Sequence, residues 1–249
     1  MIRRRWLLLA GLSAVGALAL SASFDRWKEW RALLVAPSVA RFPVRGIDVS
    51  HHQGPIDWRR VKAAGQSFAF IKATEGADFR DRRFLDNWHG ARAQGLVTGA
   101  YHFFTFCSPG AAQAENFLAV APRGEGDLPL AVDIEFAGNC TAWESLASIQ
   151  RELRVFVAHL ESSERRPPLL YTTLDSLGEL IPTDLHGYSY WIRSLWGEPG
   201  VPVRWLFWQH SSIGEVPGVR GPVDLNVFRD SPLAWRELVA GSGAPELGR

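Results

Sequence analysis

Short apolar runs alternate with longer amphipathic segments from residue 44 to residue 172. The apolar runs are typical of buried strands, and the segments between them, two of which stop at a glycine, predict helices. The predicted strands are 44–49, 68–73, 96–104, 130–135 and 169–172. The predicted helices are 56–64, which Asp57 would cap, 81–94, 109–120 and 142–162.

After residue 172 the helical pattern thins. The remaining predicted elements are the strands 188–193, 204–209 and 223–228 and a closing helix at 232–240. Alternating strands and helices predict a parallel sheet and the α/β class. About eight mostly parallel strands in one run predict an irregular (β/α) barrel with fewer than eight outer helices. In such barrels the chemistry lies at the C-terminal ends of the strands.

Residues 1–23 have the pattern of a targeting segment. Arg3–Arg5 precede an uncharged apolar run at 6–20, and Ala17–Ala19 offers a site for a signal peptidase. The run is short for a membrane-spanning helix. It predicts a signal peptide, with an uncleaved membrane anchor or a twin-arginine signal as alternatives. Each of these exports the folded part to a periplasmic or extracellular location.

The rest of the chain divides into three parts. Residues 24–44 are predicted to be a linker, either a spacer or an amphipathic helix that contacts the membrane surface. Residues 45–240 are the barrel domain, and residues 241–249 are a C-terminal tail.

The strand 130–135 ends in two acids, Asp133 and Glu135. Residues i and i+2 of a strand point to the same side, so the two carboxylates would share one face, with Cα atoms roughly 6.5–7 Å apart. Carboxylates that close ionise unequally, and one can act as an acid while the other stays charged. Glycosidic bond cleavage needs this division of roles. The alternative is a strand that ends in two solvated acids.

Acidic and aromatic residues recur near the other predicted strand ends. They are Asp48, Glu75, Tyr101, His102, Tyr171, Trp208 and Asp224. A single acid at a strand end is more often a solvated cap or part of an ion pair. Several that converge on one barrel mouth instead predict a binding site.

The composition and the motifs that are absent argue against several classes of function. The net charge of +1 argues against a nucleic-acid binder that works through a strong basic field. The sequence has seven His but no H-E-x-x-H motif and no Cys/His cluster, so neither a metal nor another cofactor is expected. It also lacks the G-x-S-x-G motif of serine hydrolases. The 11 Trp fit either the core or a platform on which sugar rings stack.

Five segments between residues 45 and 228 resemble glycoside hydrolase family 25, the Chalaropsis-type lysozymes. They are GIDVSHHQGPIDW, FAFIKATEG, GAYHFF, AVDIE and FWQHSSIGEVPGVRGPVDLNVF, in the order and spacing of that family. The resemblance implies an irregular β/α barrel. It also implies hydrolysis of the β-1,4 bond between N-acetylmuramic acid and N-acetylglucosamine in peptidoglycan.

The resemblance assigns roles to the two central acids. It implies that Glu135 is the general acid, and that Asp133 orients the acetamido group of the substrate or stabilises the developing cation. The family's mechanism is either substrate-assisted, with attack by the acetamido oxygen, or a direct displacement by water.

The predicted substrate-binding residues are Asp48, Tyr101, Tyr171, Trp208 and Asp224. By resemblance, Asp48 and Asp224 are further acids that line the site, and Tyr101 and Trp208 are aromatic positions that contact sugar. Tyr171 is added because it lies at another strand end.

Two departures from the family pattern stand out. His210 follows the Trp-Gln pair where the family often has Tyr, and residues 191–195 read WIRSL where many members have a small residue and an aromatic one. Both departures would alter the wall of a subsite and leave the predicted acids in place.

The two cysteines, Cys107 and Cys140, follow neighbouring predicted strands. Loops that leave adjacent strands of a barrel can meet, and an exported protein folds in an oxidising compartment, so we expect a disulfide. The alternative is two separate thiols.

The sequence therefore predicts an exported, monomeric muramidase that acts on peptidoglycan glycan strands and binds no nucleic acid. One rival is a non-catalytic peptidoglycan-binding protein on the same barrel, since a fold does not define a function. The other rival is a glycosidase that acts on a different N-acetylated glycan.

Overall fold

The computed structural model describes residues 35–122, 124, 126–163 and 166–241. The chain divides into two compact units, residues 1–36 and 37–249. The predicted targeting segment, residues 24–34 of the predicted linker and residues 242–249 of the tail lie outside the described residues. Among the described residues, no helix is both long enough and apolar enough to cross a membrane.

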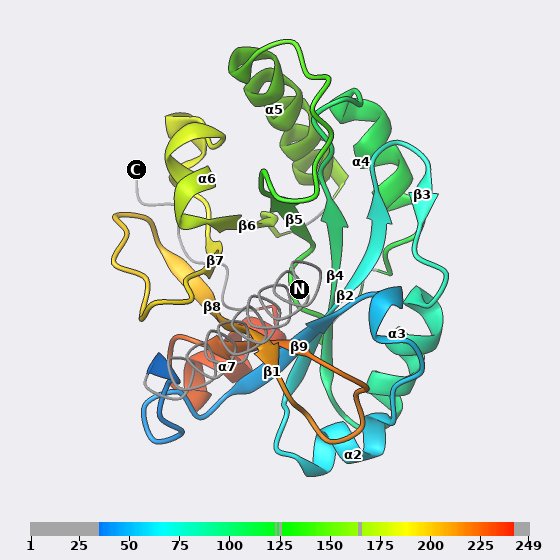
Figure 1. Cartoon of the computed structure of the whole chain (residues 1–249), viewed down its shortest axis with the longest axis vertical. Coiled ribbons are helices and arrows are strands. Elements are labelled where there is room, and N and C mark those ends of the chain that lie inside the picture. Colours follow the sequence, from blue (N-terminus) through cyan, green and yellow to red (C-terminus); the bar gives the residue numbers. More distant parts are fainter. Residues whose placement is uncertain (1–34, 123, 125, 164–165, 242–249) are drawn as a thin grey trace, which may run out of the picture. The chain divides into compact units, whose positions relative to one another are not determined.

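Eight strands close into a barrel (Figure 1). They are β1 (Arg45–Val49), β2 (Phe68–Glu75), β4 (Val97–Phe103), β5 (Ala131–Ile134), β6 (Leu169–Thr173), β7 (Tyr190–Arg193), β8 (Trp205–Gly214) and β9 (Val223–Phe228). The short β3 (Phe79–Arg80) pairs with the end of β2 outside the barrel. Within the barrel six pairings are parallel, and β9 is the only strand that runs antiparallel, to both β1 and β8. The prediction of an irregular, mostly parallel barrel is confirmed.

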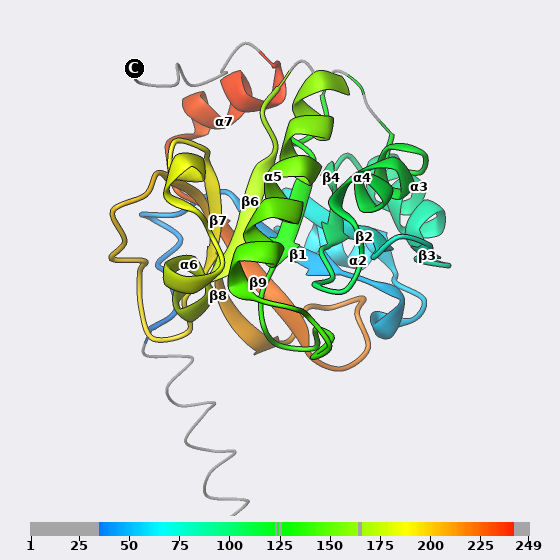
Figure 2. The ribbon, with the colours of Figure 1, turned by 90° about the horizontal axis from the view of Figure 1, so that it is seen from above.

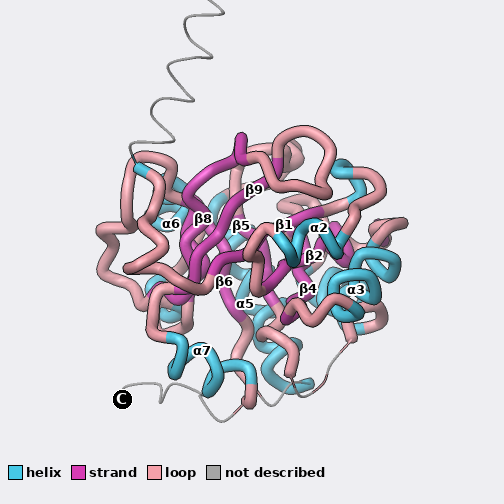
Figure 3. The backbone as a smooth tube through the Cα atoms, turned by 90° about the horizontal axis from the view of Figure 1, so that it is seen from below, coloured by secondary structure: helices cyan, strands magenta, loops and turns pink. Residues whose placement is uncertain are grey.

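Six α-helices are described in the barrel unit, fewer than the eight of a regular barrel. They are α2 (Trp58–Ala63), α3 (Phe84–Ala93), α4 (Gly110–Leu118), α5 (Leu146–Ser163), α6 (Leu174–Glu179) and α7 (Pro232–Val239). Two 3-10 turns, η1 (His51–Gln53) and η2 (Thr183–Leu185), lie in the connections. Figure 3 shows the strands in the centre with the helices outside them, and α4 and α5 pack side by side (Figure 2).

Local caps explain where several helices begin. The Asp57 side chain accepts a hydrogen bond from the Arg60 amide, as predicted, and Ser231 caps α7 in the same way. The helix α6 was not predicted, because its six residues are too few to show a helical period. It follows β6 directly, and the Thr173 hydroxyl accepts from the Ser176 amide at its start.

Alternation along each strand separates two apolar layers. One layer packs between the sheet and the helices, and it includes Ile47, Ile71, Val132, Ile134 and Ile192. The other fills the barrel interior, and it includes Phe68, Phe70, Trp191, Phe207 and Phe228. Gly46 leaves room for this interior layer, since a Cβ there would lie 2.4 Å from the Phe68 ring. On β2, β7 and β8 a polar residue follows this layer two positions later on the same face, towards the C-terminal end of the strand, namely Lys72, Arg193 and Gln209.

Residues 37–44, assigned to the linker from sequence, pack within the second compact unit. Phe42 is buried, with its ring edge-on to Trp208 at a centroid distance of 5.7 Å. Val44 belongs to the interior apolar layer.

Candidate active site

A cavity of about 310 Å³ opens at the C-terminal ends of the parallel strands. Every strand of the barrel contributes to its wall. The strand residues include Asp48, Lys72, Tyr101, Asp133, Tyr171, Trp191, Arg193, Gln209 and Asp224. Glu135 lies directly after β5 and lines the same cavity. The structure therefore brings together every predicted catalytic and substrate-binding residue except Trp208.

Asp133 and Glu135 face the cavity together, as the two-residue alternation of a strand predicts. One oxygen of each carboxylate, Asp133 Oδ1 and Glu135 Oε2, is buried without a hydrogen-bond partner among the described residues. Most buried polar atoms have such a partner. Asp133 Oδ1 is therefore free to bind a molecule that enters the cavity, and Glu135 Oε2, which faces Arg193 Nη1 at 3.5 Å, can still accept a hydrogen bond.

The two carboxylates titrate as a coupled pair. Burial raises the pKa of Asp133 well above its usual range, and the charge of Glu135 raises it further. Burial also raises the pKa of Glu135, while Arg193, whose Nη1 lies 3.5 Å from Glu135 Oε2, opposes that rise. A state in which both carboxylates are charged is therefore disfavoured, and the pair keeps a proton to higher pH than two isolated carboxylates would. The expectation that Asp133 is the charged partner of a protonated Glu135 stays a prediction, and the position of Arg193 beside Glu135 was not foreseen from sequence.

A second pair of acids lies across the cavity. Asp48 is buried, and its Oδ2 accepts hydrogen bonds from Asn226 Nδ2 at 2.7 Å and Gln209 Nε2 at 2.9 Å. Burial raises the pKa of Asp48 to about 6, although both hydrogen bonds oppose the rise. Asp224 lies opposite Asp48 in the β1–β9 register, and burial followed by the charge of Asp48 raises its pKa to about 8. The two acids titrate as a coupled pair, so a state in which both are charged is disfavoured.

Aromatic side chains form part of the cavity wall. The Tyr171 hydroxyl donates to Gln209 Oε1 at 2.9 Å, and the Tyr171 ring is edge-on to Trp191 at 4.5 Å. Trp191 Nε1 in turn donates to Asn226 Oδ1 at 2.8 Å. Tyr101 completes this wall. Trp191 was not among the predicted substrate-binding residues, although it lies two positions before Arg193 and so shares its face of β7.

Trp208 does not lie where the sequence predicted. Neighbouring residues of a strand point to opposite faces, and Gln209 faces the cavity. The Trp208 indole is therefore on the outer face of β8, where Nε1 donates to the Ser194 carbonyl at 2.8 Å. His210 is likewise buried without lining the cavity. The structure thus contradicts the expectation that Trp208 and His210 form part of a sugar-binding wall.

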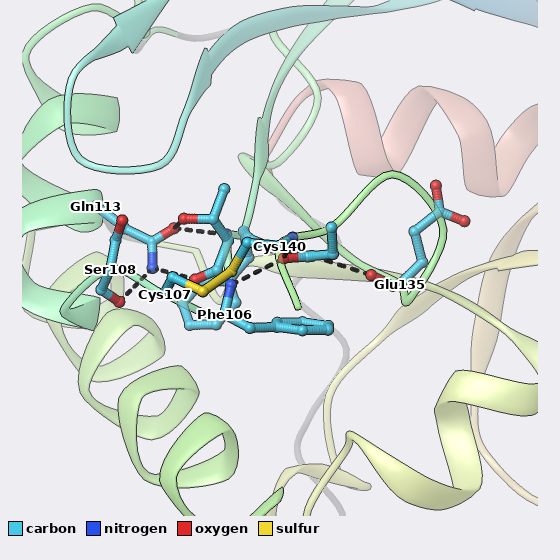
Figure 4. Close-up of a disulfide and its surroundings, with 9 residues drawn as sticks. Phe106, Cys107, Ser108, Gln113, Glu135 and Cys140 are labelled. Carbon is cyan, nitrogen blue, oxygen red and sulfur yellow. Dashed lines mark hydrogen bonds between the residues drawn. A yellow bond between two sulfur atoms is a disulfide. The ribbon is translucent and has the colours of Figure 1, made fainter. Parts of the chain in front are cut away.

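Cys107 and Cys140 form a disulfide with their Cα atoms 6.3 Å apart, which confirms the predicted pairing (Figure 4). Asn139, beside Cys140, also links the loop after β4 to the loop after β5. Its Oδ1 accepts from the Phe106 amide at 2.9 Å, and its Nδ2 donates to the Glu135 carbonyl at 3.1 Å. The disulfide and Asn139 together hold the loop after β4 against the backbone of Glu135, whose carboxylate points away from the disulfide (Figure 4).

The histidines do not form a metal centre in the described part of the chain, which contains no group of three or more His, Cys, Asp or Glu placed to hold an ion. His102 lies within the packing outside the barrel. It is hydrogen bonded to Thr74 Oγ1 at 2.7 Å and Gln113 Oε1 at 3.1 Å. Burial lowers the pKa of His102 to about 3, so it is neutral and has a structural role.

Comparison with known proteins places this barrel in one family. The model of "Glycosyl hydrolases family 25" matches residues 47–219. Lysozyme M1 from Streptomyces globisporus is 38% identical over 203 residues, which cover 76% of this chain and 68% of the relative.

Solved structures agree with this match. A family 25 glycosyl hydrolase from Bacillus anthracis superposes with a TM-score of 0.75 at 33% identity, over 82% of this chain and 96% of that one. A bacterial lysozyme from Streptomyces coelicolor superposes with a TM-score of 0.73 at 36% identity, over 80% and 98%. The chain belongs to glycosyl hydrolase family 25.

Proposed function

We propose that this protein is an exported muramidase, which hydrolyses the β-1,4 bond between N-acetylmuramic acid and N-acetylglucosamine in peptidoglycan. The observation that carries the proposal is the pair Asp133 and Glu135. The two carboxylates face one cavity, and each has a buried oxygen without a hydrogen-bond partner among the described residues. The lysozymes to which the chain is similar support the choice of substrate.

In this proposal Glu135 protonates the leaving oxygen, and Asp133 accepts a hydrogen bond from the N–H of the substrate's acetamido group. A hydrogen bond donated to a carboxylate favours its charged form. Substrate binding would therefore favour a charged Asp133 and a protonated Glu135, the group that has to donate the proton. These roles are compatible with both possible mechanisms of bond cleavage, attack by the acetamido oxygen and attack by water.

The rest of the cavity wall would hold the sugar that contributes the reacting carbon. Of the coupled acids Asp48 and Asp224, the one that carries the pair's proton can donate a hydrogen bond to a sugar hydroxyl, and the charged one can accept such a bond. Tyr101, Tyr171 and Trp191 would contact the ring and exclude water from it. No cofactor enters this scheme.

The N-terminal residues support export, because residues 1–23 have the composition of a targeting segment. The enzyme would then meet peptidoglycan outside the cytoplasm, either after cleavage of that segment or while anchored by it. We propose that it acts there as a monomer.

The direct test is the release of soluble fragments from purified, insoluble peptidoglycan. We expect the protein to clear such a suspension. A protein that sediments with peptidoglycan without clearing it would instead be a non-catalytic binding protein. Clearance of a chitin suspension but not of peptidoglycan would favour a glycosidase for another N-acetylated glycan.

We expect Asp133→Asn to lower kcat and to shift the alkaline limb of the kcat/KM profile to lower pH. The wild-type pair resists losing its last proton because two like charges would then lie side by side, and Asn removes that repulsion from Glu135. Asp230→Asn is the matched control, since Asp230 is exposed beyond the opposite end of β9. An alkaline limb that stays in place would show that the two carboxylates are not coupled.

Arg193→Met should move the same limb in the opposite direction. Arg193 lowers the pKa of Glu135, so its removal raises that pKa, and a general acid with a higher pKa keeps its proton to higher pH. The pH dependence of kcat/KM measures the effect, with Arg204→Met as the control, since Arg204 is exposed directly before β8. A limb displaced to lower pH would contradict this electrostatic assignment.

A further inference from the structure

A second hollow, of about 370 Å³, lies beside the cavity. Its wall comes from the loop after β5, the start of α6 and the loop after β7. Glu135 and Arg193 line both spaces, so the two are continuous across the proposed general acid. We call the second space the leaving-side hollow.

The positions of Asp133 and Glu135 indicate which half of a substrate the cavity would hold and which half the leaving-side hollow would hold. Asp133 lines the cavity and does not line the second hollow. The sugar that contributes the reacting anomeric carbon must lie beside Asp133, because in the proposed function that carboxylate accepts a hydrogen bond from the acetamido group of the same sugar. Glu135 meets the oxygen of the bond that breaks, so the half of the glycan beyond that oxygen extends past Glu135 into the second hollow.

Exposed apolar side chains line the leaving-side hollow. Trp196 is 68% exposed, Leu174 41% and Phe136 37%. Large apolar side chains gathered on a surface mark an interaction site. A pyranose ring presents C–H groups on its face, which pack on a flat aromatic ring, while the neighbouring Thr173 and Asp175 offer polar groups to its hydroxyls. The volume lies in the range of small-molecule sites.

The loop that carries Trp196 is held firmly at Ser194. The Ser194 carbonyl accepts from Trp208 Nε1 at 2.8 Å, and its amide donates to the Gln209 carbonyl at 3.0 Å. Its hydroxyl donates to the Gly197 carbonyl at 2.6 Å, which closes the turn around Trp196. Trp208, although it lies outside the cavity, thus fixes the loop that presents an aromatic ring to the second hollow.

We propose that the leaving-side hollow binds the N-acetylated pyranose on the leaving-group side of the scissile bond, with its ring packed on Trp196. The inference rests on the proposed function, since it assigns the halves of the substrate from the roles of Glu135 and Asp133. It assigns Trp196, Leu174 and Phe136 as residues that determine how this protein engages that sugar.

Kinetics on peptide-free glycan strands test the role of Trp196. We expect Trp196→Ala to lower kcat/KM about tenfold, the equivalent of ~1.4 kcal/mol of binding, mainly through a higher KM. Trp196→Tyr should restore kcat/KM to within about threefold, because it keeps an aromatic face. Leu233→Ala removes a similarly exposed apolar side chain from α7, outside both spaces, and should have no effect. A kcat/KM for Trp196→Ala within twofold of wild type would overturn the proposal.

Binding gives a readout that does not depend on turnover. In the Glu135→Gln protein, the indole N–H signals of Trp191 and Trp196 can be followed by NMR as peptide-free glycan strands are added. We expect both signals to move, since one ring lines the cavity and the other the leaving-side hollow. Movement of Trp191 alone would overturn this inference and leave the proposed function standing. If neither indole signal moves, both this inference and the proposed function are overturned.

Discussion

Glu135→Gln should abolish hydrolysis of peptidoglycan while the protein still folds and binds glycan strands. Gln has nearly the same shape as Glu but has no carboxylic proton to give to the leaving oxygen. General acid catalysis contributes ~10²–10⁴-fold, so we expect a loss of that size in kcat. The rate of release of soluble fragments measures it, and a variant within threefold of wild type would remove Glu135 from this role.

The stability of the same variant separates a catalytic effect from a folding defect. Burial raises the pKa of Glu135, which means that the fold disfavours the charged carboxylate. A neutral Gln should therefore leave the melting temperature at neutral pH unchanged or higher. Glu115→Gln on α4, an exposed site, is the matched control for activity. A large fall in melting temperature would show that the lost activity has a structural cause.

Removal of the disulfide should have the largest effect on stability. The bridge closes a loop with a sequence separation of 33 residues. Loop-closure entropy predicts that replacing Cys107 and Cys140 by Ala lowers the free energy of unfolding by about 3–4 kcal/mol. Chemical denaturation, followed by tryptophan fluorescence, measures this difference. Activity should fall too, because the bridge and Asn139 hold the loop that follows Glu135.

Reduced wild-type protein is the control for the double alanine variant. Cys107 is exposed, so a reductant can reach the bridge, and reduced wild-type protein should unfold at nearly the same denaturant concentration as the variant. The variant itself should not respond to reductant. Equal unfolding midpoints for the oxidised wild type and the variant would contradict a stabilising role.

Much of this structure could be predicted from short-range patterns in the sequence. The alternation of apolar runs with amphipathic segments predicted the barrel, and the spacing of Asp133 and Glu135 predicted two carboxylates on one face. The cysteines could be paired because each follows one of two adjacent strands. Each of these inferences needs only a period or a neighbouring strand, which a single sequence displays.

The contacts that could not be predicted from the sequence depend on closure of the barrel. Asp48 is held by Gln209 and Asn226, which are 161 and 178 residues away along the chain, and these contacts exist only because β9 closes the sheet against β1. Asn226 could have been noticed, since it lies two positions after Asp224 and so shares its face. No local pattern showed that Arg193 would lie beside Glu135.

Trp208 shows how a resemblance can mislead where a local rule would not. Trp208 and Gln209 are neighbours on one strand, so only one of them can face the cavity. The family pattern favoured the aromatic residue, whereas the structure places the amide inside, where it binds Asp48. The outward indole instead holds the Ser194 carbonyl, a role that sequence alone did not suggest.

The identity of the new reducing ends tests the central claim most directly. Purified peptidoglycan is digested with the protein, the soluble fragments are reduced with borohydride, and mass spectrometry identifies the reduced sugar. Hydrolysis between N-acetylmuramic acid and N-acetylglucosamine leaves N-acetylmuramic acid at the new reducing end, which is the result we predict. Reducing ends of N-acetylglucosamine would contradict the assignment of this protein as a muramidase.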